Sequence, residues 1–249
     1  MVISWMDNVK PFLIAVQIEN EIPDETFDNY LALLPEDHRN SVMKYKTKDD
    51  RDRALLGALL IRFHVSKLCS IPLQAIVIHK NKYGKPYLPM FPDIHFNLSH
   101  SGNWVVFIIG EKAVGVDAEQ IKEIDISAAA SFFSSTELQL LSSYEGHRKL
   151  ECFYDLWTLK ESYIKALGEG LSIPLDSFWI ELEPFITVHT RKGNQNWHFK
   201  QYALGDAYKL SVCSAHSSLP EKVTRMTSNE LLDQVSLHVS AQIASGHKL

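Results

Sequence analysis

Two long stretches with helical spacing constrain this chain most, because each is accompanied by several short apolar strands. Residues 49–68 begin with three aspartates suited to a helix N-terminus, Asp49, Asp50 and Asp52, and the helix at 150–167 is ended by Gly168 and Gly170. The apolar stripe of the first helix consists of Leu55, Leu56, Leu59, Leu60 and Phe63. The chain therefore divides into two halves, each pairing one long helix with an antiparallel sheet, which predicts an α+β fold.

The remaining elements are predicted from alternation and turn residues. We expect strands at 12–18, 76–79, 94–98, 104–109 and 113–117, and helices at 23–34 and 126–144. Ser135 is the expected N-cap within the second of these helices. Four further strands, at 177–183, 185–190, 197–202 and 209–214, are expected to form one antiparallel meander. The tail after Pro220 is expected to hold one weak, fraying helix near 229–239.

Size and composition exclude several classes of protein. The chain has 249 residues, and 45% of them are hydrophobic, which favours a folded protein over a disordered one. Its net charge of −5 argues against a dedicated nucleic-acid binder. Residues 1–10 lead only into the short apolar run 12–16, and no run reaches the 18 residues or so of a membrane span. Three scattered cysteines indicate free thiols. We expect a cytoplasmic protein without a membrane partner.

Charge is unevenly distributed between the two halves. Residues 39–48 and 79–92 contain several basic and no acidic side chains, whereas 117–125 contains four acids and one lysine. A basic first half facing an acidic start of the second half could bind a ligand with several phosphates together with a metal ion. Ordinary solvated surface is the alternative interpretation of such charge runs.

Asp117 and Glu119 end a predicted strand in the segment Gly-Val-Asp-Ala-Glu. Side chains at i and i+2 leave the same face of a strand, so both carboxylates can reach one ion. Hard divalent cations such as Mg²⁺ prefer carboxylate oxygens, often one or two together with substrate phosphates. Two solvent-facing acids at a strand end are the competing interpretation.

Trp157, Glu161 and Lys165 are spaced at i, i+4 and i+8 and form one stripe of the second long helix. Phe153 and Ile164 flank this stripe, so it borders the buried face. A carboxylate there is costly unless it is paired or bound to metal. The competing interpretation is a helix-stabilising Glu–Lys pair worth about 0.2–0.5 kcal/mol.

The segment Asn97–Gly102, with the sequence Asn-Leu-Ser-His-Ser-Gly, follows a strand and enters a turn. A histidine in such a place can donate to a phosphate together with backbone N–H groups. A structural role for His100 is the alternative. No acid lies nearby in the sequence, so a nucleophilic triad through Ser99 is unsupported, and the histidines lack zinc spacing.

These segments together resemble the 4′-phosphopantetheinyl transferases, in particular the larger, two-lobed type that activates surfactin synthetase. The resemblance covers about residues 12–235 and is carried by the segments 97–102, 115–119, 132–137 and 153–165. Tyr83-Gly-Lys-Pro86, Arg53–Gly57 and Leu171–Phe178 fit the same family. The combination of G-x-D-x-E with W-x-x-K-E-x-x-x-K is highly specific.

The resemblance implies an enzyme that moves 4′-phosphopantetheine from coenzyme A to a serine of an apo carrier protein, leaving adenosine 3′,5′-bisphosphate. It also implies a pseudo-twofold fold with coenzyme A between the lobes. The implied Mg²⁺ ligands are Asp117, Glu119 and Glu161. The implied catalytic residues are Glu161, as the candidate base, and Lys165, which also contacts coenzyme A. The implied nucleotide-binding residues are Lys48, Arg53, Lys85, Ser99 and His100. Relatives carry several basic residues before the first long helix, whereas residues 35–40 here offer His38 or Arg39.

We expect an N-terminal lobe at 1–113, a C-terminal lobe at 114–235 and a tail at 236–249. The partner is a peptidyl, polyketide or fatty-acid carrier domain, and the enzyme is expected to be a monomer. An apolar docking patch is expected from residues that follow the acidic strand, namely Ile121, Ile124, Ile126, Phe132 and Phe133, with a buried core as the alternative. A magnesium-dependent nucleotide hydrolase and a non-catalytic binding module are the competing functions.

Overall fold

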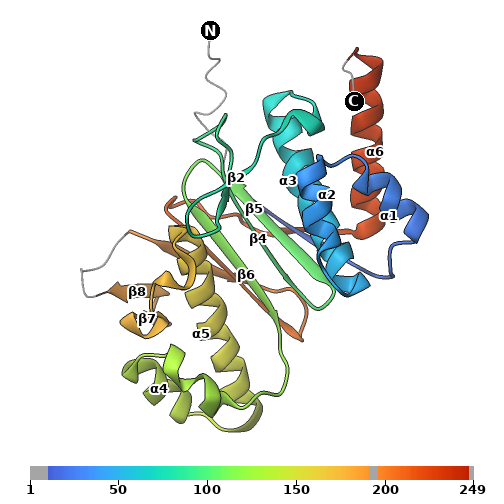
Figure 1. The fold of residues 1–249 in the computed structure, drawn as a ribbon. Helices are drawn as coiled ribbons and strands as arrows, with labels where there is room; N and C mark the ends of the chain where they lie inside the picture. Colours follow the sequence, from blue (N-terminus) through green and yellow to red (C-terminus); the bar gives the residue numbers. More distant parts are fainter. Residues whose placement is uncertain (1–10, 191–195, 247–249) are drawn as a thin grey trace.

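The N-terminal lobe is built on a four-stranded sheet. The computed structural model describes residues 11–190 and 196–246, which form two mixed lobes lying side by side (Figure 1). The strand order of the first sheet is β11-β1-β5-β4. Its strands are β1 (Phe12–Gln17), β4 (His95–Ser101), β5 (Trp104–Gly110) and β11 (Val223–Thr227). β1 and β4 pair antiparallel with β5, whereas β11 runs parallel to β1.

The C-terminal lobe contains a three-stranded antiparallel sheet with the order β6-β10-β9. Its strands are β6 (Val114–Gln120), β9 (His198–Tyr202) and β10 (Tyr208–Ser214). A separate hairpin pairs β7 (Phe178–Glu181) with β8 (Thr187–Thr190). The predicted single meander of four strands is therefore wrong.

A buried ion pair explains why β7 does not extend the larger sheet. The Lys160 ammonium lies 2.7 Å from the Glu137 carboxylate, and both side chains are fully buried. Lys160 also donates to the carbonyl of Phe178, and the Ile180 N–H donates to Glu137. These two side chains thus satisfy backbone groups of β7 that a neighbouring strand would otherwise use.

The long helix α3 (Lys48–Cys69) covers the first sheet, as predicted from its apolar stripe. Thr47 is its N-cap, and the Thr47 hydroxyl accepts a hydrogen bond from the N–H of Asp50. The helices α1 (Asp24–Leu31), α2 (Glu36–Met43) and α6 (Ser228–Ala244) lie on the same side of the molecule (Figure 1). α2 was not predicted. The expected strand at 76–79 is reduced to β2 (His79–Lys80), which pairs with β3 (Pro86–Tyr87).

The second long helix, α5 (Gly146–Leu167), packs on the C-terminal sheet. The predicted helix 126–144 is instead a 3₁₀ segment, Ile126–Phe132, followed by α4 (Ser135–Ser142). The N-cap of α4 is Ser134, one residue before the predicted Ser135, and it forms a capping box with Glu137. This cap needs an extended backbone at Ser134, so the helix has to restart there.

The C-terminal segment completes the N-terminal lobe. β11 pairs with β1, and Leu231 and Val235 of α6 are buried in the same core as α3. His238 and Gln242 both hydrogen-bond the hydroxyl of Ser66 on α3. The helix predicted near 229–239 is confirmed as α6, but the expectation that it is weak and frays is wrong, since α6 extends to Ala244 and is held by Ser66 of α3. The proposed lobe boundaries stay a prediction, although this segment packs away from the lobe to which most of it was assigned.

The α+β class, with one long helix packed on each sheet, is confirmed. Within residues 11–190 and 196–246, no helix combines the length and apolar character needed to cross a membrane. The expectation about a signal peptide concerns residues 1–10, which lie outside the described residues.

His64 on α3 gives the fold a predictable pH dependence. Its ring lies among Phe12, Phe63 and Phe107 at centroid distances of 5.3, 4.9 and 5.6 Å. Burial, and then the charge of Lys67, lower the pKa of His64 from 6.5 to about 4. The unfolded chain then binds the extra proton, so stability falls as pH drops from 6.5 toward 4.

We expect the His64→Phe variant to lose less stability on acidification than the wild type, by about 2 kcal/mol between about pH 7.5 and about pH 5. Urea unfolding at both pH values measures this difference. His147→Phe is the control, because the His147 side chain is 71% exposed. Equal acid sensitivity of wild type and His64→Phe would contradict the prediction.

Candidate active site

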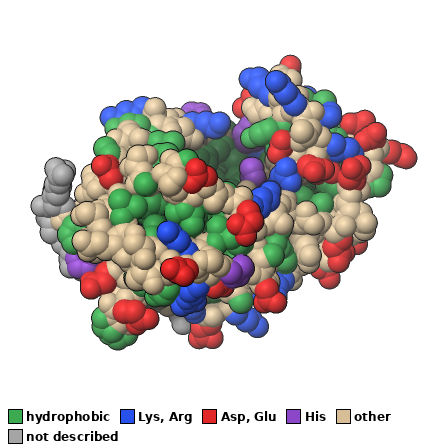
Figure 2. Space-filling model, turned by 90° about the horizontal axis from the view of Figure 1, so that it is seen from below, with side chains coloured by type: hydrophobic (Ala, Val, Ile, Leu, Met, Phe, Trp, Pro, Cys, Tyr) green, Lys and Arg blue, Asp and Glu red, His purple; other side chains and the backbone are tan. Residues whose placement is uncertain are grey.

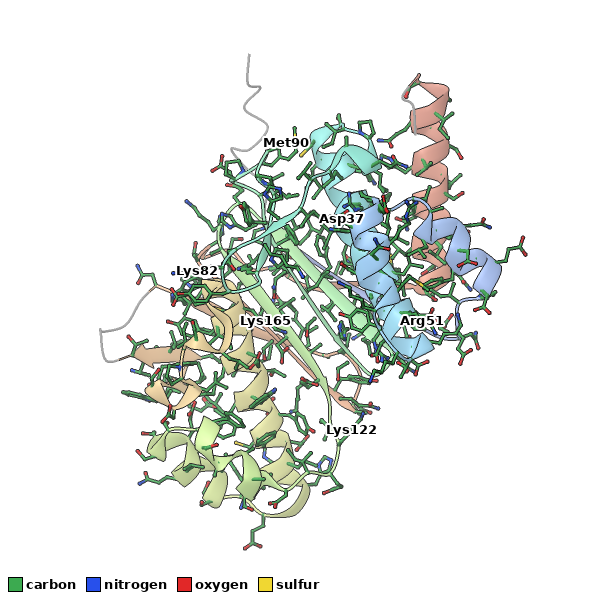
Figure 3. The ribbon with its side chains drawn as sticks, viewed as in Figure 1. Asp37, Arg51, Lys82, Met90, Lys122 and Lys165 are labelled. Atoms are coloured by element: carbon green, nitrogen blue, oxygen red, sulfur yellow. The ribbon has the colours of Figure 1, made fainter. Side chains whose placement is uncertain are left out.

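Close packing of α5 on β6 brings the predicted acidic strand and the predicted helix stripe together. Gly115 of β6 lies directly beneath the backbone of Ser162 and Ala166. A glycine is needed there because a side chain would overlap the helix backbone. The Lys165 ammonium lies 2.6 Å from Oδ1 of Asp117, and Figure 3 places Lys165 between the helix and the strand.

Asp117 is buried, with 3% of its surface exposed, and its two carboxylate oxygens differ. Oδ1 accepts hydrogen bonds from Lys165 and, at 3.0 Å, from the hydroxyl of Ser99. Oδ2 is also buried but has no hydrogen-bond partner. A buried carboxylate oxygen without a donor is costly, and a cation bound there would remove that cost.

Two further carboxylates lie close enough to Asp117 to feel its charge. Burial, followed by the charge of Asp117, raises the pKa of Glu161 to about 6 and raises that of Glu119. The charge of Lys165 acts to lower the pKa of both carboxylates. Three mutually repelling acids share one nearby lysine, which makes this an electrostatic setting for a divalent cation.

The chemistry of these donors fits Mg²⁺. Among the described residues, no group of three or more His, Cys, Asp or Glu side chains is arranged to hold a metal ion. Magnesium does not require such a group, because it commonly takes one or two carboxylates and completes its octahedral shell with water and substrate phosphates. The unpartnered Oδ2 of Asp117 is a carboxylate oxygen of the kind that such a shell uses, and Glu119 and Glu161 lie close enough to feel the charge of Asp117.

Side chains rather than backbone pairing join the two lobes at this place. Asn97, Ser99 and Ser101 alternate along β4 and accept hydrogen bonds from successive outward-facing N–H groups of β6. These N–H groups belong to Val116, Ala118 and Gln120, at 2.9, 3.2 and 3.0 Å. We call this set the serine ladder. The predicted nucleotide contact Ser99 is a member, and its hydroxyl is occupied by the ladder and by Asp117.

Two of the predicted nucleotide-binding residues, Arg53 and His100, lie near the acids and Lys165. Arg53 donates to the carbonyl of Gly102 and pairs with Asp50 at 2.7 Å. Burial, then the charges of Arg53 and Lys165, lowers the pKa of His100. His100 keeps an exposed face, so a bound phosphate could reverse the effect of the two cations. The space-filling view shows the surface hollowed between the lobes, with histidine, lysine and arginine side chains at its edge (Figure 2).

Two other residues predicted to bind the nucleotide, Lys48 and Lys85, are bonded to groups of the protein itself. Lys48 lies 3.0 Å from Asp24 and 3.6 Å from Asp52. Lys85 donates to the carbonyls of Val114, Lys165 and Ala166 at 3.2, 2.6 and 2.9 Å. Burial lowers the pKa of Lys85 to about 8. The Lys85 ammonium therefore caps the end of α5 with two hydrogen bonds and joins it to β6 with a third, and its predicted contact with coenzyme A stays a prediction.

Ser101 and Asn97 are the residues that sequence reasoning missed. Both belong to the segment 97–102, but neither received a role. The available signal was their alternation with Ser99, since residues at i, i+2 and i+4 share one face of a strand. What the alternation could not show is that this face meets the backbone of β6.

A separate hollow of about 460 Å³ contains none of the predicted site residues. Trp104, Leu204, Tyr208 and Met226 supply its apolar wall, and Arg225 at its edge donates to the carbonyl of Ala203. It lacks the clustered acids and cations of the inter-lobe hollow. The chemistry of the molecule is therefore concentrated between α5, β6 and β4.

One buried acid, two half-buried acids and a lysine on the facing helix, with cations at the edge of the hollow, form an arrangement suited to a substrate that carries phosphates. Residues 113–213 match the family model described as the 4′-phosphopantetheinyl transferase superfamily, and residues 22–112 match the model for the N-terminal part of 4′-phosphopantetheinyl transferase. The chain therefore belongs to the 4′-phosphopantetheinyl transferases, as the sequence predicted. These enzymes transfer phosphopantetheine from coenzyme A to carrier proteins.

Individual relatives agree with this assignment. 4′-phosphopantetheinyl transferase Sfp of Bacillus subtilis is 33% identical over 88% of this chain and 99% of its own length. 4′-phosphopantetheinyl transferase gsp of Aneurinibacillus migulanus is 38% identical over 88% of this chain and 92% of its own. The human L-aminoadipate-semialdehyde dehydrogenase-phosphopantetheinyl transferase is 29% identical over 88% and 76%, respectively.

Proposed function

We propose that the residues around Asp117 carry out this transfer with Mg²⁺, on apo carrier domains of peptide, polyketide or fatty-acid synthesis. The observation that supports the metal site is the buried, unpartnered Oδ2 of Asp117 beside Glu119 and Glu161. A bound Mg²⁺ would neutralise charge on the diphosphate of coenzyme A and act as a Lewis acid.

The residues of this chain have separate tasks in the proposed reaction. The carrier serine oxygen forms a bond to the phosphorus next to pantetheine, and the bond from that phosphorus to the bridging diphosphate oxygen breaks. Adenosine 3′,5′-bisphosphate leaves. Lys165 donates to the phosphoryl oxygens as charge develops on them. Glu161 takes the serine proton, directly or through water.

The nucleotide end of coenzyme A is assigned to the cationic edge. Arg53 and His100 are supported by their position beside Lys165 and Asp50. Lys48 and Ser99 complete the proposed set, although each already has protein partners, and the predicted contact of Lys85 with coenzyme A is left to a test of its own. His38 is not included in the nucleotide-binding set, because its Nδ1 already lies 3.2 Å from the guanidinium of Arg62.

The carrier domain is proposed to dock on the segment that follows β6. Ile124 and Phe132 are 39% and 41% exposed and can contribute to an apolar surface. Phe133 is 3% exposed and packs in the core of the lobe, so its inclusion in the predicted patch was wrong. Ile121 and Ile126 are partly buried against the same core.

We further infer that the enzyme works as a cytoplasmic monomer without a nucleic-acid partner. The monomer is supported by the two lobes of one chain, which supply both the acidic and the cationic side of the hollow. A second copy is not needed to complete it.

Mass spectrometry of an apo carrier domain tests the proposed function. Incubation with the enzyme, coenzyme A and Mg²⁺ is expected to add one phosphopantetheine to the carrier, and chelation of the metal should prevent the addition. An unchanged carrier, with an active transferase as positive control, would overturn the proposal. Breakdown of coenzyme A without carrier modification would identify a hydrolase, and binding without any reaction would identify a binding module.

A Lys85→Met variant distinguishes the two roles open to Lys85. Its removal leaves the carbonyls of Lys165 and Ala166 at the end of α5, and that of Val114 on β6, without their donor, and we expect this to displace Lys165. We expect kcat to fall about tenfold or more while KM for coenzyme A changes little. Lys82→Met, in the exposed part of the same hairpin, is the control. A rise in KM alone would return Lys85 to the nucleotide site.

A further inference from the structure

Ser101 of β4 makes two hydrogen bonds with opposite roles. Its hydroxyl donates to Oε2 of Glu119 at 2.8 Å and accepts from the N–H of Gln120 at 3.0 Å. A hydroxyl has one proton to donate, so the bond from Gln120 fixes the direction in which Ser101 offers that proton. The side chain of Ser101 is thereby aimed at Glu119.

Ser99 repeats this arrangement one step earlier. It accepts from the N–H of Ala118 at 3.2 Å and donates to Oδ1 of Asp117 at 3.0 Å. The serine ladder therefore places one hydroxyl opposite each acid of the Asp-Ala-Glu segment. Asn97, the third member, bonds the N–H of Val116 at 2.9 Å but contacts neither acid.

Glu119 depends on this contact more than Asp117 does. Asp117 is held by both Lys165 and Ser99, whereas the described residues give the Glu119 carboxylate one hydrogen bond, from Ser101. Asp117 and Glu119 leave the same face of β6, so the two like charges repel each other. A long side chain repelled by its neighbour would otherwise rotate away from Asp117.

We propose that Ser101 is a positioning residue that holds Glu119 beside Asp117 for metal binding, with Ser99 doing the same for Asp117. This inference rests on the proposed function, in which both acids are Mg²⁺ ligands. It adds a task to the serine ladder, which joins the two lobes and also orients the ligand set. Groups that hydrogen-bond a metal ligand tune the site in this way, and their loss typically weakens metal binding about 10- to 100-fold.

Three variants separate positioning from simple support of the fold. Ser101→Ala removes both hydrogen bonds, Ser101→Thr keeps the hydroxyl, and Asn97→Ala removes one ladder bond that reaches no acid. The readouts are the Mg²⁺ concentration at half-maximal transfer, the calorimetric affinity of the enzyme–coenzyme A complex for Mn²⁺, and the melting temperature.

We expect Ser101→Ala to weaken both metal measures about tenfold or more, and Ser101→Thr to stay within about threefold of the wild type. Asn97→Ala should lower the melting temperature while leaving metal affinity near that of the wild type. If Asn97→Ala does not fold, the comparison of alanine with threonine at position 101 still decides.

Wild-type metal affinity in Ser101→Ala would overturn the inference and leave the proposed function standing. An equal loss in a folded Asn97→Ala would also overturn it, because the effect would then belong to the joint between the lobes. A wild-type enzyme that transfers without any divalent metal would instead overturn the proposed metal site itself.

Discussion

Replacing Asp117 by asparagine is expected to lower the rate of carrier modification by about 100- to 1000-fold, the range typical of a lost electrostatic group at a reacting centre. The amide keeps the shape of the side chain and can still accept from Ser99. The substitution removes the negative charge that lies 2.6 Å from the Lys165 ammonium, and it also removes the carboxylate oxygen proposed as a metal ligand. Lys165 would then lack its partner, and the two other acids would lack the ligand that completes their set.

The measurement is the rate of mass gain by an apo carrier, with the melting temperature recorded in parallel. Asp155→Asn is the matched control, because Asp155 also pairs with a lysine, Lys209, at 3.1 Å. The Asp155–Lys209 pair is separate from the three acids of the proposed metal site, so the Asp155→Asn variant should transfer phosphopantetheine at close to the normal rate. Full activity of a folded Asp117→Asn variant would remove Asp117 from the metal site.

The acidic strand and the helix stripe could each be predicted from local periodicity, whereas their meeting at one site was implied only by the family resemblance. Two-residue alternation placed Asp117 and Glu119 on one face, and four-residue spacing aligned Glu161 with Lys165. The structure brings these two patterns together, because α5 packs directly on β6. The first competing interpretation, two solvent-facing acids, does not fit the burial of Asp117. The second, a helix-stabilising Glu161–Lys165 pair, does not fit the ion pair that Lys165 makes with Asp117.

Contacts between segments far apart in the sequence could not be predicted in this way. β11 pairs with β1 across about 200 residues, and nothing in either strand specifies the other as its partner. Lys85 likewise looked like a phosphate ligand because its carbonyl partners on α5 carry no side-chain signature. Charge patterning locates cations but does not show whether their donors are already used by the backbone.

The junction between the lobes has a physical consequence for the site. Where two strands pair through their backbones, no side chain is needed to hold them. Here β4 reaches β6 through Asn97, Ser99 and Ser101, so the same hydroxyls contact the backbone and the acids. The serines that join the lobes are therefore the same ones that hydrogen-bond Asp117 and Glu119.

The closeness of α5 and β6 depends on Gly115, and a Gly115→Ala variant is expected to lose both stability and activity. The added Cβ would overlap the carbonyl oxygen of Ser162 and lie 2.5 Å from the backbone nitrogen of Ala166. Backbone atoms of a helix cannot swing aside as a side chain can, so the whole helix has to shift. We expect a loss of about 3 kcal/mol in the free energy of unfolding, and transfer slower by about 100-fold because Glu161 and Lys165 move from Asp117.

Denaturant unfolding and the carrier-mass assay measure the two effects, and Gly57→Ala supplies the comparison. A Cβ at Gly57 on α3 would lie 3.3 Å from Cδ1 of Leu98, a flexible side-chain atom that can yield. Alanine also favours a helix interior over glycine by about 1 kcal/mol, so that variant should be near neutral. A Gly115→Ala enzyme with normal stability would show that α5 can move without cost. If it also kept normal activity, the distance between Lys165 and Asp117 would not control the transfer rate.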